Sequence, residues 1–201
     1  VYIKAGTYRE KITVRNHRNT ILVGEDAATT VLTWDDCAGT IGPNGQELGT
    51  QNSASLTISS TDFMAVNLTI ENSHKNDTGQ GDQAVAVGAY SDRTAFYNCR
   101  LVGYQDTFYV KNNGRVYCRD CYIEGNVDFI FGDAVLLCEN CRLHCNRNDS
   151  VVTAAADHSK SRFGFVFADC TLTHIEGSAF TGKPFSTFHL GRPWKAGAQV
   201  V

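Results

Sequence analysis

The chain lacks several features that would place it in other classes of protein. Only three of its 201 residues are proline, so predicted strands are little interrupted. No basic run is present and the net charge is -3, which argues against nucleic acid as a partner. The longest apolar runs are far shorter than a membrane span, and no signal peptide is visible. We therefore expect one domain, residues 1–201, with neither a membrane nor a nucleic acid as partner.

Cysteine, by contrast, is abundant. Eight cysteines are many for a cytosolic enzyme of 201 residues and favour an oxidising compartment. Two Cys-x-x-Cys pairs, CRDC (118–121) and CENC (138–141), have the spacing of a zinc ribbon. The chain also begins in a strand-like segment, VYIKAGTY, and ends in QVV, so we expect a piece cut at both ends from a longer protein.

A degenerate repeat explains the cysteines better than a zinc site does. Each copy has Asn or Asp, then Cys, then any residue, then Leu or Ile. The copies are NCRL (98–101), DCYI (120–123), NCRL (140–143) and DCTL (169–172). A fifth segment, VNLTI (66–70), has the same shape with Val66 in place of the cysteine. Each cysteine copy follows a short, apolar, strand-like run, which predicts an all-β chain.

The period predicts a parallel β-helix, a solenoid with one coil per repeat. Equivalent residues on adjacent coils then stack at about 4.8 Å, the spacing of paired strands. We expect Cys99, Cys121 and Cys141 to form one inward column. That spacing also permits disulfides, with Cys121–Cys141 and Cys118–Cys138 as candidates. We favour Cys121–Cys141, and a reduced stack of thiols is the alternative.

Two aspartates share one phase of the repeat. Asp106 and Asp128 each lie seven residues after a repeat cysteine, and Asn148 lies seven after Cys141. On stacked coils the two carboxyl groups would lie roughly 5 Å apart, so one of them should keep its proton near neutral pH. A carboxylate beside a carboxylic acid suits nucleophilic catalysis with a general acid. The alternative is a pair of solvated strand aspartates without a catalytic role.

Four motifs around these residues resemble the pectin methylesterases, also called pectinesterases. They are DQAVAV (82–87), GYQDTFYV (103–110), GNVDFIFGDA (125–134) and LGRPWK (190–195), and GTQNSASLTI (49–58) is a weaker fifth. The resemblance implies a right-handed, single-stranded parallel β-helix that hydrolyses the methyl esters of pectin to pectate and methanol. It also implies a secreted enzyme of the extracellular space, cell wall or periplasm, acting on homogalacturonan without metal or cofactor. We expect it to be a monomer.

The resemblance assigns a role to each matching position. Asp128 would be the nucleophile, and Asp106 the general acid that protonates methanol and then activates water. Gln105 and Gln83 would donate hydrogen bonds to the oxyanion. Arg192 would keep Asp128 ionised and correctly aimed. The plainer alternatives are a strand-edge cap for Gln83, a solvent-bound side chain for Gln105 and a surface cation for Arg192.

The substrate cleft is expected to be lined by aromatic side chains. Tyr109, Phe131 and Trp194 match cleft positions of the family, and aromatic faces suit pyranose rings. Val127 and Thr50 are weaker candidates for substrate contact. Because strand aromatics more often belong to the core than to a ligand site, Phe131 is the least secure of these residues.

Two other functions compete with the esterase. Two carboxylates about 5 Å apart also fit a retaining glycosidase, so a pectin-depolymerising hydrolase or lyase on the same solenoid is one alternative. A catalytically inactive, carbohydrate-binding β-helix is the other. Gln105 and Arg192 favour the esterase, because acyl transfer needs an oxyanion site. No Gly-x-Ser-x-Gly motif is present, so a serine triad has no support.

Overall fold

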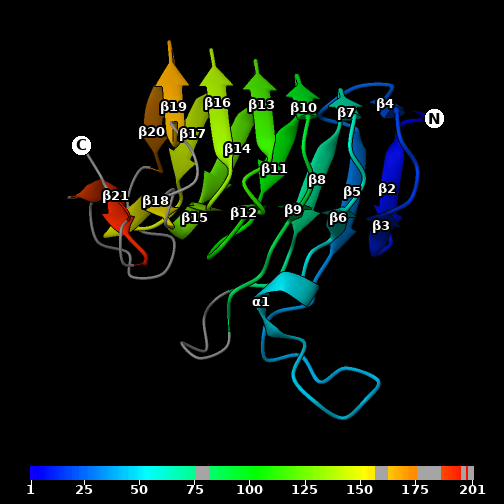
Figure 1. The fold of residues 1–201 in the computed structure, drawn as a ribbon, viewed down its shortest axis with the longest axis horizontal. Coiled ribbons are helices and arrows are strands. Elements are labelled where there is room, and N and C mark those ends of the chain that lie inside the picture. The colour runs from blue at the N-terminus through cyan, green and yellow to red at the C-terminus, as the bar shows by residue number, and fades with distance from the viewer. Residues whose placement is uncertain (76–81, 157–162, 176–186, 196–197, 199–201) are drawn as a thin grey trace.

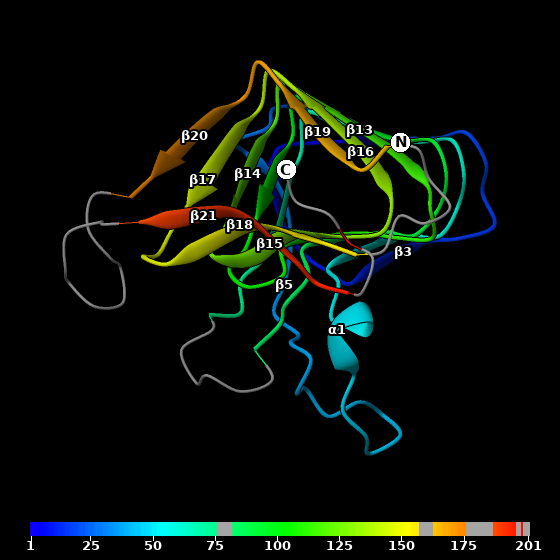
Figure 2. The ribbon, with the colours of Figure 1, turned by 60° about the vertical axis from the view of Figure 1, so that its left-hand side comes forward.

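The chain winds into a parallel β-helix with three sheets. The computed structural model describes residues 1–75, 82–156, 163–175, 187–195 and 198. In that part of the chain each sheet has seven strands, and every strand pairs in parallel with strands of the neighbouring coils. Figure 1 shows the coils side by side, and Figure 2 shows the three walls that they form. The predicted all-β parallel β-helix is confirmed.

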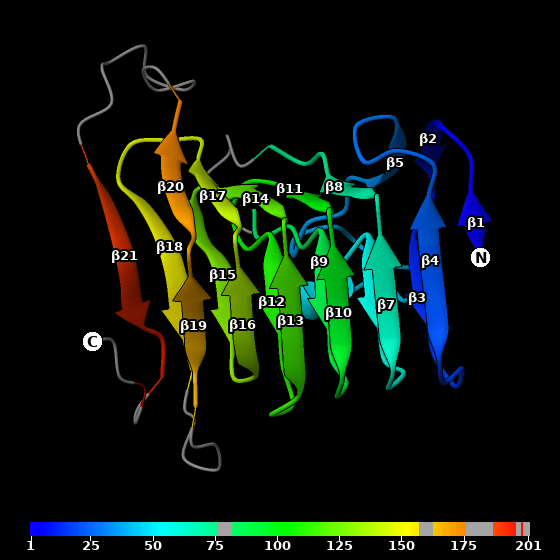
Figure 3. The ribbon, with the colours of Figure 1, turned by 90° about the horizontal axis from the view of Figure 1, so that it is seen from above.

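Consecutive strands enter the three sheets in turn, so every coil gives one strand to each sheet. The first sheet, seen face-on in Figure 3, contains β1 (Tyr2–Ile3), β4 (Thr20–Gly24), β7 (Phe63–Val66), β10 (Thr94–Tyr97), β13 (Arg115–Arg119), β16 (Val135–Glu139) and β19 (Phe165–Ala168). The second contains β2 (Gly6–Arg9), β5 (Thr30–Trp34), β8 (Thr69–Asn72), β11 (Arg100–Val102), β14 (Tyr122–Gly125), β17 (Arg142–Cys145) and β20 (Thr171–His174). The third contains β3 (Ile12–Val14), β6 (Leu56–Ile58), β9 (Val87–Ala89), β12 (Phe108–Val110), β15 (Val127–Gly132), β18 (Ser150–Ala155) and β21 (Phe188–Pro193).

One connection leaves the solenoid and covers part of the third sheet. Between β5 and β6 the chain projects outward and includes the short helix α1 (Gly49–Asn52), as Figure 2 shows. The hydroxyl of Tyr90 donates a hydrogen bond of 3.1 Å to the carbonyl of Gln51, which ties α1 to this sheet. Across the residues that the structure describes, no helix is long and apolar enough to cross a membrane.

The Asn or Asp of each repeat fills a left-handed turn between the first and second sheets. Asn98, Asp120 and Asn140 have φ angles of 47°, 55° and 51°, a region that Asn and Asp tolerate better than other residues with side chains. Their side chains also pair along the solenoid, since Asn140 Nδ2 donates to Asp120 Oδ1 at 2.6 Å. The repeat therefore records a turn conformation as well as a core position.

The repeat cysteines form the predicted inward column. Cys99, Cys121 and Cys141 are 1%, 3% and 2% exposed. Their carbonyls accept hydrogen bonds from the next coil, as from Tyr122 N to Cys99 O at 2.9 Å. One detail of the pattern was wrong. The register pairs Val66 with Tyr97, so Leu68, and not Val66, takes the cysteine's place in the preceding coil.

The CRDC and CENC pairs belong to two columns of the solenoid. Cys118 and Cys138 face each other across β13 and β16, both fully buried, while Cys121 and Cys141 belong to the repeat column. All eight cysteines are free thiols in the structure. The favoured Cys121–Cys141 disulfide is therefore absent, and the stack is the reduced alternative. Burial against apolar neighbours, rather than covalent bonding, accounts for these thiols.

Thiol titration provides a direct check of the reduced interior. The protein, denatured without a reductant, should give eight thiols per chain, because the structure has no bridged pair. The same sample denatured after reduction is the control and should give the same count. A count of six before reduction, rising to eight after it, would contradict the reduced columns.

Candidate active site

Asp106 and Asp128 stand on adjacent coils of the third sheet. Asp106 lies in the turn before β12, and Asp128 is the second residue of β15, the neighbouring strand. The backbone N–H of Asp106 donates to the carbonyl of Val127 at 3.0 Å. Phe108 pairs with Ile130, so the two aspartates hold equivalent places. They are only 7% and 6% exposed, which makes them two buried acids side by side.

A β-bulge sets the direction of Asp128. Val127 pairs with Val151 and Ile130 pairs with Thr153, so two residues of β15 oppose one residue of β18. Asp128 is one of these two residues, and its φ of 53° lies in the left-handed region. Bulges re-aim side chains and occur often beside active sites. The bulge lets Phe129 pack in the core while the carboxylate of Asp128 meets Arg192.

The same register excludes Asn148 from this column. Gly125 pairs with Cys145, and Val127 pairs with Val151. The turn between Cys145 and Val151 is therefore longer than the corresponding turn of the preceding coil. The prediction that Asn148 shares the phase of the aspartates was therefore wrong. Counting a constant offset from Cys141 fails where the turn between the second and third sheets changes length.

Arg192 binds Asp128 with a two-pronged contact. Its Nε donates to Asp128 Oδ1 at 2.7 Å, and its Nη2 donates to Oδ2. Arg192 lies on β21, two strands from β15, and the intervening partner in register is Ala154. The small alanine leaves room for the arginine to reach across β18. This parallel pairing, available to a guanidinium but not to an ammonium, holds the carboxylate in one orientation.

Burial and charge both act on Asp106. Burial raises the pKa of Asp106 well above its ordinary value, and the negative charge of Asp128 raises it further. The positive charge of Arg192 opposes these effects without cancelling them. The raised pKa favours the protonated form of Asp106, beside an Asp128 side chain that is already paired with a cation. That is the division of roles expected of a general acid and a nucleophile.

The two predicted oxyanion glutamines lie on neighbouring coils beside Asp106. Gln105 directly precedes Asp106, and its carbonyl accepts a hydrogen bond from Ala84 N at 3.1 Å. Gln83 directly precedes Ala84, and its carbonyl accepts from Ala38 N at 2.8 Å. Both glutamines are partly exposed. Their backbones thus lie together at the N-terminal ends of the strands, next to the acid.

The predicted aromatic residues form one cluster on the outer face of the third sheet. Tyr109 and Phe131 stack with ring centroids 4.2 Å apart and an interplanar angle of 16°. Trp194 meets Phe131 edge-on at 5.7 Å and Tyr109 at 6.3 Å. Phe131 is only 2% exposed and Tyr109 7%, whereas Trp194 is half-buried. Phe131 therefore supports the cluster from below, and Trp194 offers the larger accessible face.

The two weaker substrate candidates lie at opposite edges of this surface. Val127 is partly exposed and directly precedes Asp128. Thr50 is partly exposed in α1, which Tyr90 ties to the sheet, and Tyr90 contacts the ring of Tyr109 at 5.4 Å. Nine of the ten predicted site residues thus lie on strands of the third sheet or in the segments that adjoin them, and Thr50 lies in α1, which is tied to that sheet.

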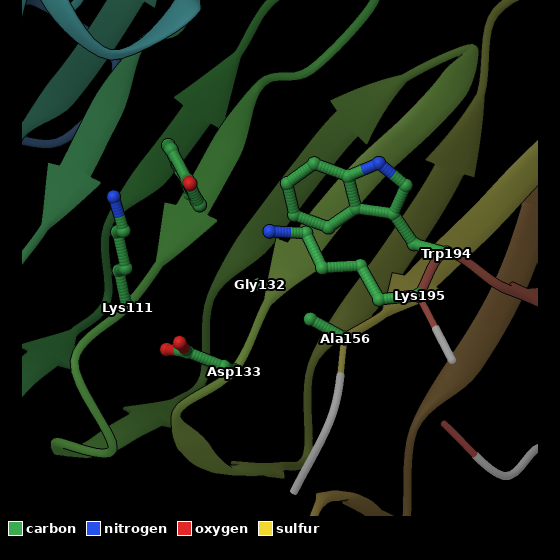
Figure 4. A pocket seen from close by; sticks show the side chains of 7 residues that line it. Lys111, Gly132, Asp133, Ala156, Trp194 and Lys195 are labelled. Carbon is green, nitrogen blue, oxygen red and sulfur yellow. The ribbon is translucent and has the colours of Figure 1, made fainter. Parts of the chain in front are cut away.

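Sequence reasoning missed a small cavity beside the aromatic cluster, shown in Figure 4. Its volume is about 210 Å³ and it is lined by Tyr109, Lys111, Gly132, Asp133, Ala156, Trp194 and Lys195. The motifs GYQDTFYV, GNVDFIFGDA and LGRPWK end in or beside these residues. The residues at the ends of the motifs could therefore have indicated the cavity. Throughout the described ranges, no group of three or more His, Cys, Asp or Glu residues is placed to hold a metal ion.

Comparison with known proteins identifies the family of the chain. The family model described as Pectinesterase matches residues 1–201. The chain belongs to the pectinesterase family. Pectinesterase 31 from Arabidopsis thaliana is 37% identical over 206 residues, covering 100% of this chain and 62% of the relative. The family match over the whole chain confirms the resemblance that the five motifs suggested.

Solved pectin methylesterases share the fold. Pectin methylesterase PemA from Erwinia chrysanthemi is 34% identical with a TM-score of 0.86, covering 96% of this chain and 61% of that protein. A pectin methylesterase in complex with a hexasaccharide is 35% identical with a TM-score of 0.85, at 96% and 61% coverage. The chain therefore spans about three fifths of the length of these relatives.

The raised pKa of Asp106 makes stability depend on pH. An unfolded aspartate has a pKa of about 3.9. Between that value and the higher folded pKa, the folded protein binds more protons than the unfolded chain, so its stability falls as pH rises. Asp106→Asn removes this loss. Between the two pKa values, the variant should gain about 1.4 kcal/mol of stability relative to the parent for each unit of pH. Above the folded pKa of Asp106, this difference should stay constant.

Urea unfolding from pH 4 to pH 8 measures this difference. Asp120→Asn is the matched control, because Asp120 is an exposed aspartate with a similar φ of 55°. Parallel stability profiles for the parent and Asp106→Asn would show that the Asp106 carboxyl group titrates alike in the folded and unfolded states.

Proposed function

We propose that this chain hydrolyses the methyl esters of pectin, releasing methanol and leaving free carboxylates on the galacturonate chain. The observation that carries the proposal is the two-pronged pairing of Arg192 with Asp128 beside the buried acid Asp106. Membership of the pectinesterase family supports it.

Asp128 is suited to the attack. Its carboxylate oxygen adds to the carbonyl carbon of the methyl ester and gives a tetrahedral intermediate. Arg192 already restricts the conformation of the Asp128 side chain, so little further conformational freedom is lost when the ester binds. The arginine also offsets the cost of burying the charge before reaction. Attack by a carboxylate produces a mixed anhydride between Asp128 and the galacturonate.

Asp106 supplies the proton that the leaving group needs. Methoxide is a poor leaving group, and the raised pKa of Asp106 keeps a proton available near neutral pH. As the C–O bond breaks, that proton passes to the departing oxygen and methanol forms. Asp106 is then a carboxylate, able to take a proton from the water that attacks the anhydride. This second step restores the Asp128 carboxylate and the Asp106 acid.

The glutamines are the proposed donors to the oxyanion. The tetrahedral intermediate carries negative charge on the former carbonyl oxygen, and preorganised N–H groups stabilise it. Gln83 and Gln105 flank Asp106 from two coils. Trp194, supported by Tyr109 and Phe131, would hold the sugar rings against the sheet. Val127 and Thr50 would contact the substrate at the two edges of this surface.

A retaining glycosidase remains the second candidate for two stacked carboxyl groups. The esterase is favoured because acyl transfer needs donors to an oxyanion, which Gln83 and Gln105 can supply, and because the chain belongs to the pectinesterase family. Methanol release without a fall in polymer length separates the two activities. We further propose that the enzyme is secreted, because its polymeric substrate lies outside the cell, and that it acts as a monomer. The free thiols give that location no support of their own.

Replacing each aspartate in turn tests the assigned roles. Asp128→Asn keeps the shape but removes the nucleophile, so methanol release from methylated pectin should all but vanish. Asp106→Asn should also cripple methanol release, yet its defect should shrink with an activated ester, such as a nitrophenyl ester, whose leaving group needs no proton. Near-normal methanol release by Asp128→Asn, with Asp106→Asn inactive on every ester, would mean that the roles are reversed.

Arg192→Lys tests the forked contact rather than the charge. Lysine keeps the positive charge but cannot bind both oxygens in parallel, so kcat/KM for methanol release should fall about tenfold or more. Arg119→Lys on an exposed strand end is the matched control. If Arg192→Lys retained full activity, charge alone would suffice and the orienting role would be disproved.

A further inference from the structure

A buried acid lies directly before Gln83, outside the pair of aspartates that the proposed reaction uses. Asp82 is only 3% exposed, and burying a charged carboxylate is costly unless it is paired. One partner is His74, whose Nε2 lies 3.1 Å from Asp82 Oδ1. An ionised carboxylate only accepts hydrogen bonds, so Nε2 is the donor in this contact. The pair joins the segment after β8 to the segment before β9.

The backbone of His74 is attached to a buried side chain of β8. The N–H group of His74 donates to Asn72 Oδ1 at 3.1 Å. Asn72 is buried, and its Nδ2 donates to the carbonyls of Asp36 at 2.9 Å and Val85 at 3.0 Å. Val85 lies two residues after Gln83. One asparagine therefore fixes both the backbone that carries His74 and the backbone that carries Gln83.

These contacts hold Gln83 from both sides. Asp82, which precedes Gln83, binds His74. Val85, which follows it, binds Asn72. A donor to an oxyanion is most effective when it is already in place, because reorientation during the reaction costs part of the stabilisation. A loosely held Gln83 would therefore stabilise the transition state less than a fixed one.

Resting on the proposed function, we infer that Asp82 and His74 form a positioning pair that aims the side-chain amide of Gln83 at the oxyanion. Both residues act through Gln83 and are therefore positioning residues. The oxyanion develops only on the way to the transition state, so loss of the pair should lower kcat and leave KM nearly unchanged. A pair that only stabilised the fold would lower the unfolding temperature without this selective effect on kcat.

Replacing His74 provides the first test. His74→Leu removes the donor to Asp82, so kcat for methanol release from methylated pectin should fall about tenfold, less than the roughly hundredfold loss typical of a missing oxyanion donor. His74→Gln keeps an N–H group near the position of Nε2 and should restore most of the parental kcat. His17→Leu replaces an exposed histidine between β3 and β4 and is the matched control, with kcat unchanged. A parental kcat in His74→Leu would overturn the inference.

A double-mutant cycle with Gln83 separates positioning from a general structural effect. Gln83→Ala removes the amide that the pair is inferred to aim, and kcat should fall about a hundredfold. If the pair acts through Gln83, His74→Leu should cause no further loss of kcat in the Gln83→Ala background. An equal loss in both backgrounds would show that His74 acts elsewhere and would overturn the inference.

A second variant guards against misfolding. Because His74→Leu takes a partner from a buried carboxylate, the Asp82→Asn, His74→Leu double variant removes the negative charge together with the imidazole. It should show a similar fall in kcat with a smaller loss of thermal stability than His74→Leu alone. Thermal unfolding of every variant shows whether it is folded at the assay temperature. A folded double variant with the parental kcat would contradict the positioning role.

A measurement without catalysis distinguishes failure of this inference from failure of the proposed function. Nitrogen-15 relaxation of the Gln83 side-chain amide, assigned by its loss in Gln83→Ala, reports how rigidly that amide is held. Its order parameter should fall in His74→Leu and stay parental in His17→Leu. If the parent releases no methanol, the esterase proposal fails, and this comparison alone decides whether the pair positions Gln83. An unchanged order parameter in His74→Leu would overturn the inference.

Discussion

Hydrogen bonding between successive coils is the constraint on which the rest of this structure depends. Each strand pairs in parallel with the equivalent strand of the next coil, so each residue stands beside its counterpart about 4.8 Å away. Inside the solenoid this constraint builds columns such as Cys99, Cys121 and Cys141. On the outer face it builds rows of polar groups. A site made in this way needs residues at matching phases, and not residues close in sequence.

The same constraint creates the electrostatic problem at Asp106 and Asp128. Stacking forces two carboxyl groups together where water is largely excluded, and like charges in such a place are costly. The structure places the two carboxyl groups in different surroundings. Arg192 takes both oxygens of Asp128, while burial and the neighbouring charge raise the pKa of Asp106. Two chemically identical side chains thereby have different surroundings: one is paired with a cation, and the other has a raised pKa, as the proposed reaction requires.

Much of the fold could be predicted from the sequence because the solenoid repeats its own pattern. The repeat around Cys99, Cys121 and Cys141 fixed the period, and the period fixed the neighbours in space. Prediction failed where the turns change length. Asn148 does not share the phase of the aspartates, because the turn before β18 is longer. Leu68, and not Val66, corresponds to the repeat cysteine, and the fifth copy lacks the cysteine that would have marked this register. The Cys121–Cys141 bridge failed because strand spacing permits a disulfide but does not require one.

The residues of the candidate site, too, could be predicted only in part from the sequence. Asp106, Asp128 and Arg192 lie in motifs dense enough to be recognised, and the structure joins them. Lys111 and Asp133 escaped notice because each is an ordinary surface residue until the register sets it in a row with Trp194. Parallel strands all run in the same direction, so residues that follow the strands, such as Lys111 and Asp133, gather at one end of the sheet, and the two aspartates gather at the other end.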